Sequence, residues 1–501
     1  MFNERKSGVL AHPTSFPGAY SMGDLGKGAY DFVDFLYSAK QKLWQVLPLG
    51  PTGYGDSPYQ SFSSFAGNHY MISFDLLKEE GYLTEEDLAG IPNFDPRKID
   101  FGPVIIYKMQ ILKKAFENYK KVATAAQKKK IQQFATKQKD WLEDYALFTA
   151  LKDQNDGNEW FKWSKPLVKR EPAAIKAAKA DHKDAMDFCI FLQYEFFRQW
   201  SGLKTYANKK GIEIIGDIPI FVAHDSVDVW ANPELYQLDA NGLPTGVAGV
   251  PPDYFSETGQ LWGNPLYAWD VHKKTNYAWW CKRVAAVLSL VDIVRIDHFR
   301  GFEAYWSVPY GEETAINGKW VKGPGKSLFT ALKKALGNNL PIIAEDLGEI
   351  TKAVDKLRLG QNLPGMRVLH FAFDGTGESN HLPHNFESSL TVAYTGTHDN
   401  NTTRGWYNEA TDIEKDYLRR YMNISGEDVA WDLIRLCMSS NAAFSIVPVQ
   451  DIMNLPAQDR MNTPGDASGW WGFRYTSNML TAAQAERLKY LTELFARYVN
   501  C

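Results

Sequence analysis

Eight short runs of apolar and β-branched residues recur along the chain, and each ends in a turn or a polar cluster. Continuous apolarity, rather than alternation, is typical of strands buried on both faces. Helix-like segments separate most of the runs, and residues 28–41, for example, place four apolar side chains at helical spacing. This repeated alternation predicts an α/β protein, a closed (β/α)8 TIM barrel. The runs are residues 8–12, 43–49, 212–218, 291–297, 341–346, 366–373, 391–397 and 443–450.

Two stretches interrupt the repeat. About 160 residues separate the second and third runs, far more than one crossover needs. We therefore expect the first two strands and a following loop in residues 1–84, an inserted, mainly helical subdomain in residues 85–205, and the other six strands in residues 206–501. A long aromatic loop at residues 223–267 is a candidate lid over the active site. A ninth strand candidate, residues 70–76, is placed outside the repeat, and no separate C-terminal β domain is expected.

Composition excludes several classes of protein. The formal net charge of −4 favours neither nucleic acid nor an anionic membrane surface. No stretch has the roughly 20 apolar residues of a membrane span, and the first residues lack the apolar run of a signal peptide. The four cysteines are widely spaced and indicate a reducing compartment. We expect a cytoplasmic protein that is a monomer or a weak homodimer.

Four of the predicted strands end in acidic residues: Asp217, Asp297, Glu345 and Asp399. A single such residue is often only a strand-end or helix-capping group. Four of them favour an active site, because the C-terminal ends of barrel strands form one rim, and this rim holds the active site in barrel enzymes. The sequence therefore predicts a carboxylate-based active site, provided that the barrel is right.

The surroundings of two carboxyls suggest different roles. Arg295 and Asp297 are two residues apart on one strand, so both side chains point to the same face. The guanidinium is expected to lower the pKa of Asp297 and keep it ionised, as a nucleophile must be. Glu345 follows the apolar run PIIA, where desolvation favours the protonated form of a general acid. Two carboxyls with such different surroundings are typical of glycoside cleavage.

A resemblance sharpens this prediction. The motifs RIDH, AEDLG and TGTHDNNT, in this order, resemble those of the α-amylase clan of glucan-cleaving barrels. Within the clan, the chain resembles the amylomaltases, which are the 4-α-glucanotransferases or disproportionating enzymes of glycoside hydrolase family 77. Phrases that carry this likeness cover nearly the full length, and include LAHPTSFPG, GDSPYQSFSSFAGN, GDIPIFV, GVPPDYFSETGQLWGNP, LHFAFDG and RMNTPG.

The resemblance implies a catalytic role for each of three carboxyls. Asp297 would be the nucleophile that forms a β-linked glucosyl-enzyme, and Glu345 would serve as acid and then base. Asp399 would bind hydroxyls of the sugar being cleaved, with the neighbouring His398 as a donor. Arg295 would orient Asp297. The two working carboxyls should stand about 5–5.5 Å apart, as retention of configuration requires.

Five further residues are assigned to substrate binding by the same resemblance. Tyr59 would stack on the glucose at the −1 subsite, and Asp217 would support the carboxylate cluster. Trp262, in the candidate lid, would form a platform near the acceptor. Asp374 and Asn462 would contact sugar hydroxyls. Each also has a plainer alternative, because loops and turns need aromatic and polar residues for packing and hydrogen bonding.

Neither a cofactor nor a metal is expected. In amylases the aspartate of the third strand is usually followed by an Asn-His pair that helps to bind calcium, whereas here Asp217 is followed by IPIFV. Three histidines, His224, His298 and His370, lie near acidic residues. They have no metal-ligand spacing, so structural roles are favoured.

The resemblance implies transfer of α-1,4-glucan segments to the 4-hydroxyl of an acceptor. The donors would be maltooligosaccharides, amylose or glycogen-derived glucans, and glucose or a maltooligosaccharide would accept. Two alternatives stay open: an α-glucan hydrolase of related type, and a non-catalytic glucan-binding barrel. The intact set of Asp297, Glu345 and Asp399 disfavours the second alternative.

Overall fold

The computed structural model describes residues 2–252, 256–466 and 469–498. Its main sheet has eight parallel strands in the order β10-β11-β12-β1-β2-β3-β6-β9. A backbone hydrogen bond of 2.9 Å from Ala344 to Pro364 joins the two end strands, so the barrel is nearly closed. The strands are β1 (Lys6–Leu10), β2 (Leu43–Gln45), β3 (Glu213–Pro219), β6 (Ile293–Asp297), β9 (Ile342–Ala344), β10 (Gly365–Val368), β11 (Thr391–Tyr394) and β12 (Phe444–Pro448). Each of the eight apolar runs therefore overlaps a strand, and the predicted TIM barrel is confirmed.

Helices cover the barrel because they connect parallel strands that must run in the same direction. A helix precedes each of six barrel strands. After β10 the connection has only two 3-10 turns, η8 (Leu369–Phe371) and η9 (Pro383–Asn385). The connecting helices are α1 (Lys27–Ser38), α8 (Lys183–Lys209), α11 (Ala278–Leu290), α12 (Lys326–Leu336) and α13 (Lys352–Gly360), with α14 (Thr403–Glu409), α15 (Asp412–Met422) and α16 (Val429–Ser439) between β11 and β12.

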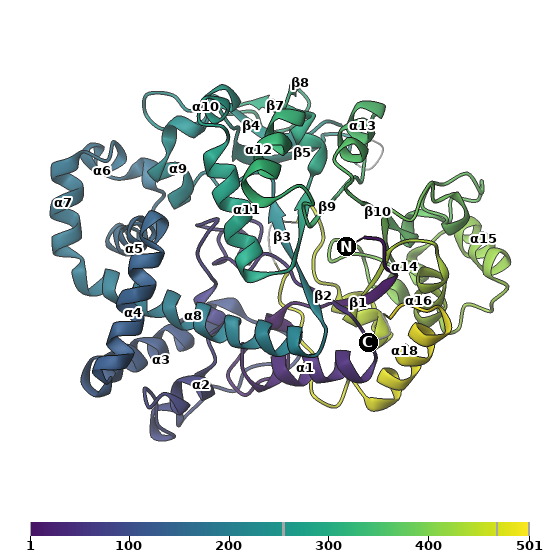
Figure 1. Cartoon of the computed structure of the whole chain (residues 1–501), viewed down its shortest axis with the longest axis horizontal. Helices are drawn as coiled ribbons and strands as arrows, with labels where there is room; N and C mark the ends of the chain where they lie inside the picture. Colours follow the sequence, from purple (N-terminus) through teal and green to yellow (C-terminus); the bar gives the residue numbers. More distant parts are fainter. Residues whose placement is uncertain (1, 253–255, 467–468, 499–501) are drawn as a thin grey trace.

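The long stretch between β2 and β3 is helical. Figure 1 shows these helices gathered on one side of the barrel, opposite α14, α15 and α16. Helix α8 crosses the boundary that was expected at residue 205. The division of the chain into residues 1–84, 85–205 and 206–501 therefore stays a proposal. The ninth strand candidate, residues 70–76, is wrong: it forms the 3-10 turn η3 (His69–Met71) and the start of α2 (Phe74–Glu79). The other helices here are α3 (Phe101–Val122), α4 (Ala125–Lys137), α5 (Lys139–Gln154), α6 (Lys165–Val168) and α7 (Pro172–Asp181).

The structure has a second sheet, which the sequence pattern did not indicate; its strand labels stand near those of α10 (Trp269–Lys274) and α12 in the view of Figure 1. It is antiparallel, with the strand order β5-β4-β7-β8. Two of its strands, together with α9 (Val227–Ala231), lie in the segment 223–267 that was expected to be a loop, of which residues 253–255 are outside the described part. Its strands are β4 (Gly246–Val250), β5 (Gln260–Pro265), β7 (Ala304–Pro309) and β8 (Lys319–Lys322).

The described residues after β12 form helices, including α17 (Val449–Ile452) and α18 (Ala482–Leu494), and no strand. This agrees with the expected lack of a C-terminal β domain. None of the helices in the described ranges is long and apolar enough to cross a membrane.

Candidate active site

Parallel pairing brings the predicted carboxyls to one rim of the barrel. In the register of β3 and β6, Asp217 lies opposite Arg295, and Pro219 lies opposite Asp297, the last residue of β6. On the other side of β6, Ile296 lies opposite Ala344, so Glu345 leaves β9 one residue later, near the end of β6. The carboxyl ends of three adjacent strands therefore deliver Asp217, Asp297 and Glu345 to one region.

Arg295 connects two of these carboxylates. Its Nη1 donates to Oδ2 of Asp217 at 2.6 Å, and its Nη2 donates to Oδ1 of Asp297 at 2.9 Å. The Asp217 side chain is fully inaccessible, whereas that of Asp297 is 30% exposed. The guanidinium therefore anchors to a buried acid on one side and presents a partly open carboxylate on the other. The charge-assisted hydrogen bond to Asp217 fixes the Arg295 guanidinium, and the one to Asp297 fixes the orientation of that carboxylate.

Backbone groups hold the Glu345 carboxyl. Its Oε2 accepts a hydrogen bond from the amide of His298 at 2.6 Å, and its Oε1 accepts one from the amide of Leu347 at 2.7 Å. The residue is only 8% exposed. Glu345 is thus oriented by the chain that leaves β6 and by the turn that follows β9.

The two carboxyls differ in acidity. Burial raises the pKa of Glu345 to about 8, the charge of Asp297 adds to this rise, and Arg295 opposes it. Burial also raises the pKa of Asp297 to about 6. The expected lowering by Arg295 is present, but burial outweighs it, and the charges of Asp217 and Asp399 add to the rise. Near pH 7 Asp297 is therefore mostly ionised while Glu345 is mostly protonated, which is the division of roles that glycoside cleavage needs.

Asp399 lies in a polar group that follows β11. Its Oδ1 accepts a hydrogen bond from Nδ2 of Asn462 at 2.7 Å, and its Oδ2 lies 3.3 Å from Nε2 of His398. Arg460 donates to the carbonyl of Asp399 at 3.0 Å and to that of Asn462 at 2.8 Å. The structure thus brings together three residues singled out in the sequence, and it adds Arg460, the first residue of the RMNTPG motif, to which the sequence analysis gave no role.

Tyr59 joins this polar group to the Arg295 network. Its hydroxyl donates to Oδ2 of Asp217 at 2.8 Å. Its ring stacks on that of His398, with centroids 5.1 Å apart and planes at 10°, and Trp471 packs on the same pair. Tyr59 therefore links the β3 side of the rim to the segment after β11. Trp471, which no sequence motif singled out, is the second aromatic ring here.

Trp262 and Asp374 have different surroundings. Trp262 is half-buried on β5, and its ring meets that of His298 edge to face, with centroids 4.8 Å apart. Asp374 is exposed, and its carboxylate accepts hydrogen bonds from the amide and hydroxyl of Thr376, as a turn residue does. None of the contacts described for Asp374 reaches the carboxylate cluster. Its role in binding sugar stays a prediction.

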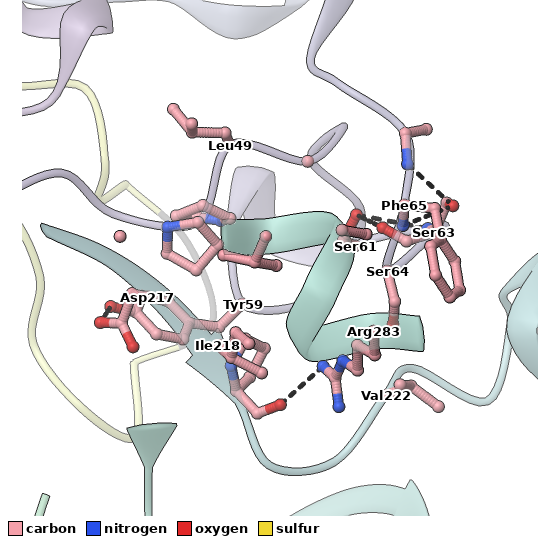
Figure 2. A pocket seen from close by; sticks show the side chains of 18 of the residues that line it. Leu49, Tyr59, Ser61, Ser63, Ser64, Phe65, Asp217, Ile218, Val222 and Arg283 are labelled. Atoms are coloured by element: carbon pink, nitrogen blue, oxygen red, sulfur yellow. Dashed lines mark hydrogen bonds between the residues drawn. The ribbon is translucent and has the colours of Figure 1, made fainter. Parts of the chain in front are cut away.

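A small pocket, partly open to solvent, has Tyr59 and Asp217 among the residues that line it. Figure 2 shows these two side chains at one end of it, with Arg283 at the other end bonded to a backbone carbonyl. Apolar side chains such as Leu49 and Val222 form much of its wall. The pocket includes neither Asp297 nor Glu345, so it is distinct from the space in front of those carboxyls.

Two histidines outside the cluster pack against other residues. His224 lies 2.8 Å from the carbonyl of Gly242 and stacks on Phe161, and His370 lies 2.9 Å from the hydroxyl of Thr403. In the described part of the chain, no group of three or more His, Cys, Asp or Glu side chains could hold a metal ion.

Comparisons with known proteins agree with this geometry. A family model described as 4-alpha-glucanotransferase matches residues 11–481. The 4-alpha-glucanotransferases of Synechocystis sp. (strain ATCC 27184 / PCC 6803 / Kazusa) and Thermus thermophilus are 50% and 49% identical to this chain, over 100% and 98% of its length and 99% of theirs. The solved structure of the amylomaltase from Streptococcus agalactiae in complex with acarbose is 40% identical and matches with a TM-score of 0.96, over 99% of this chain and 100% of that one. The chain therefore belongs to the 4-alpha-glucanotransferase family, glycoside hydrolase family 77.

Proposed function

We propose that this transferase moves a segment of an α-1,4-glucan to the 4-hydroxyl of an acceptor sugar by a retaining double displacement. The observation that carries the mechanism is the pair of carboxyls at adjacent strand ends. Asp297 is held by Arg295, and burial raises its pKa to about 6. Glu345 is held by two backbone amides, and burial raises its pKa to about 8. A carboxylate beside a carboxylic acid can attack and protonate in the same step.

In the first displacement an Asp297 oxygen attacks the anomeric carbon. The bond from this carbon to the glycosidic oxygen breaks, and that oxygen takes the proton of Glu345. The released segment leaves with a new 4-hydroxyl, and a β-linked glucosyl-enzyme remains. In the second displacement Glu345, now ionised, removes the proton of the acceptor 4-hydroxyl while its oxygen attacks the anomeric carbon. Asp297 leaves as a carboxylate, and the new bond is again α.

Other side chains prepare these steps. Asp399, oriented by Asn462 and His398, is placed to bind two hydroxyls of the −1 sugar and to favour its distorted ring. The Tyr59 ring offers an apolar face to the same sugar. Arg295 keeps one Asp297 oxygen engaged, so the other is left to attack. The separation of the Asp297 and Glu345 carboxyls should be about 5–5.5 Å for retention.

Transfer rather than hydrolysis requires that an acceptor sugar displaces water. The segment 223–267 supports this part of the proposal, because it brings Trp262 against His298, next to the proposed nucleophile. We propose Trp262 as the acceptor platform and this segment as the lid. Hydrolysis is then a minor side reaction.

The substrates and setting are also proposals. The donors would be maltooligosaccharides, amylose or glycogen-derived glucans, and glucose or a maltooligosaccharide would accept. Two observations support this choice: the Streptococcus agalactiae amylomaltase was solved in complex with acarbose, and the family is named for its action on α-glucans. Three described cysteines, Cys189, Cys281 and Cys437, are free thiols, which suits a reducing cytoplasm. We propose a monomer or weak homodimer that needs no metal or cofactor.

The test is incubation of the purified protein with maltotriose, with products separated by chromatography and total reducing ends measured. Glucose together with a ladder of longer maltooligosaccharides, at constant reducing ends, is the expected result. Rising reducing ends with only shorter products would identify a hydrolase and contradict the acceptor-platform argument. Binding of maltooligosaccharides without any turnover would instead identify a glucan-binding barrel.

A further inference from the structure

His298, directly after the proposed nucleophile, has a left-handed backbone conformation, with φ 52° and ψ 48°. A residue with a β-carbon rarely adopts this conformation, and such strain persists only where the surrounding structure maintains it. The chain then enters the short 3-10 helix η7 (Phe299–Phe302). We therefore ask which contacts maintain this conformation and what it does for the neighbouring residues.

The consequence is the orientation of Glu345. The left-handed turn points the His298 amide at Oε2 of Glu345, at 2.6 Å. On either side of this contact, Phe299 N–H donates to the carbonyl of Glu345 at 3.1 Å, and Glu345 N–H donates to the carbonyl of Ile296 at 3.0 Å. The exits of β6 and β9 are thus joined by three hydrogen bonds, of which only the one from His298 reaches the carboxyl group itself. A change in the backbone angle at His298 would remove that bond.

The cause is the packing of the imidazole ring. Trp262 meets it edge to face at 4.8 Å and 85°. On another side the ring approaches Gly301, where an added β-carbon would lie 3.3 Å from the imidazole Cδ2 and 2.8 Å from Ile220 Cδ1, so the glycine leaves room for the ring. The ring's Nε2 is buried and has no hydrogen-bond partner among the described residues. The imidazole ring therefore acts here through packing contacts rather than through hydrogen bonds of its Nε2 atom.

The charge state of His298 agrees with this role. Burial lowers its pKa to about 3, and the nearby Arg300 contributes in the same direction. The imidazole is thus neutral throughout the neutral pH range and is unsuited to exchange protons with the substrate there. What it supplies to Glu345 is a fixed backbone amide.

We propose that His298 is a positioning residue for Glu345, and that Trp262 fixes the turn through which it acts. This inference rests on the proposed function, in which Glu345 is the acid/base and Trp262 meets the acceptor. It deepens that function, because Trp262, which meets the acceptor, also maintains the geometry of Glu345, which deprotonates the acceptor.

Misalignment of the His298 amide has a predictable sign. An amide that donates to a carboxylate stabilises the charged form, so its loss raises the pKa of Glu345 further. The other groups that face Glu345 are Asp297, whose charge raises this pKa, Arg295, which lowers it, and the amide of Leu347, which also lowers it. None of these is removed by substitution of His298. The alkaline limb of kcat against pH, where Glu345 loses its proton, should therefore move to higher pH.

The experiment compares His298→Ala with His298→Asn in the full chain, with maltotriose as substrate. Both variants lose the imidazole, but asparagine adopts the left-handed conformation at a lower cost than alanine. For alanine we expect a fall in kcat of about tenfold, with KM little changed, and an alkaline limb about 0.5 pH unit higher. Asparagine should restore most of kcat and return the limb to its wild-type position.

A second pair tests the contact with Trp262. Trp262→Ala removes the ring edge and should move the alkaline limb in the same direction as His298→Ala, whereas Trp262→Phe keeps an aromatic edge and should not. Circular dichroism and thermal unfolding show whether each variant is folded. If His298→Ala does not fold, the two Trp262 variants still test the proposal.

The proposal is overturned if alanine and asparagine at 298 reduce kcat equally with no movement of the limb. It is also overturned if Trp262→Ala raises only the KM for acceptor. Failure of the proposed function is a separate result, because the wild-type protein would then not disproportionate maltotriose at all.

Discussion

Arg295 Nη1 and Asp217 Oδ2 lie 2.6 Å apart in the interior of the barrel, and the Asp217 side chain has no exposed surface. The pair is formed across β3 and β6, where the two residues are direct neighbours in the register. It fixes the guanidinium that holds Asp297 on its other side. The proposed nucleophile is thus oriented by an ion pair whose two side chains are almost fully buried, and this arrangement can be tested.

Asp217→Asn should leave Arg295 with Asp297 as its only charged partner. Loss of one member of a buried ion pair is strongly destabilising, and we expect a loss of about 3 kcal/mol in the free energy of unfolding. Turnover should fall about 100-fold, because Asp297 is less well oriented. The charge of Asp217 raises the pKa of Asp297, so its removal should move the acid limb of activity to lower pH.

Urea unfolding and a pH profile measure these effects. The matched control is Asp374→Asn, the same chemical change at an exposed turn residue. It should change stability by less than about 0.5 kcal/mol. Equal losses of stability from the two substitutions would contradict the role given to the Asp217–Arg295 pair.

Asp297→Asn and Glu345→Gln should each lower turnover of maltotriose by at least about 1000-fold, because one removes the nucleophile and the other the proton donor. Circular dichroism should show that both variants remain folded. Near-normal rates in either purified variant would remove that residue from the mechanism.

The pH dependence of kcat/KM should be bell-shaped with its maximum near pH 7. Below a pH of about 6 Asp297 gains a proton and cannot attack, and above a pH of about 8 Glu345 loses the proton that it must donate. Initial rates at low maltotriose concentration, measured across this range, give the two limbs. Because the carboxyls interact, the limbs belong to the pair rather than to either residue alone. A rate that stays constant from pH 5 to pH 9 would rule out this pair of titrating groups.

Substitutions of Tyr59 should separate its two contacts. Tyr59→Phe removes only the hydroxyl that donates to Asp217, and we expect turnover to fall by about tenfold or less. Tyr59→Ala also removes the ring that stacks on His398 and is proposed to face the sugar, so the loss should be at least about tenfold greater. Kinetics with maltotriose measure both. If the two variants behave alike, the ring contributes nothing beyond the hydroxyl.

Treatment with EDTA followed by gel filtration should leave activity and thermal unfolding temperature unchanged. The carboxylates of the site are already engaged by Arg295, by backbone amides and by Asn462. Activity that is lost on treatment and returns with added calcium would show that the protein depends on a metal.

Local sequence was sufficient for the strands and for the acidic residues at their ends. A strand buried on both faces is marked by its own apolar run, and parallel strands place their C-terminal residues on one rim whatever the details of packing. For this reason Asp217, Asp297 and Glu345 could be located without a structure. The motifs around them were sufficient for the family, which the comparisons confirm.

The tertiary structure decided what depends on contacts between distant segments. The sequence suggested that Arg295 would lower the pKa of Asp297, but the extent of its desolvation in the folded protein reverses the net direction. The antiparallel sheet that carries Trp262, the left-handed turn at His298 and the bond from Arg460 to Asp399 were also beyond local inference. Periodicity records which side chains are buried, whereas desolvation, strain and cross-strand partners arise only when segments far apart in the chain are packed together.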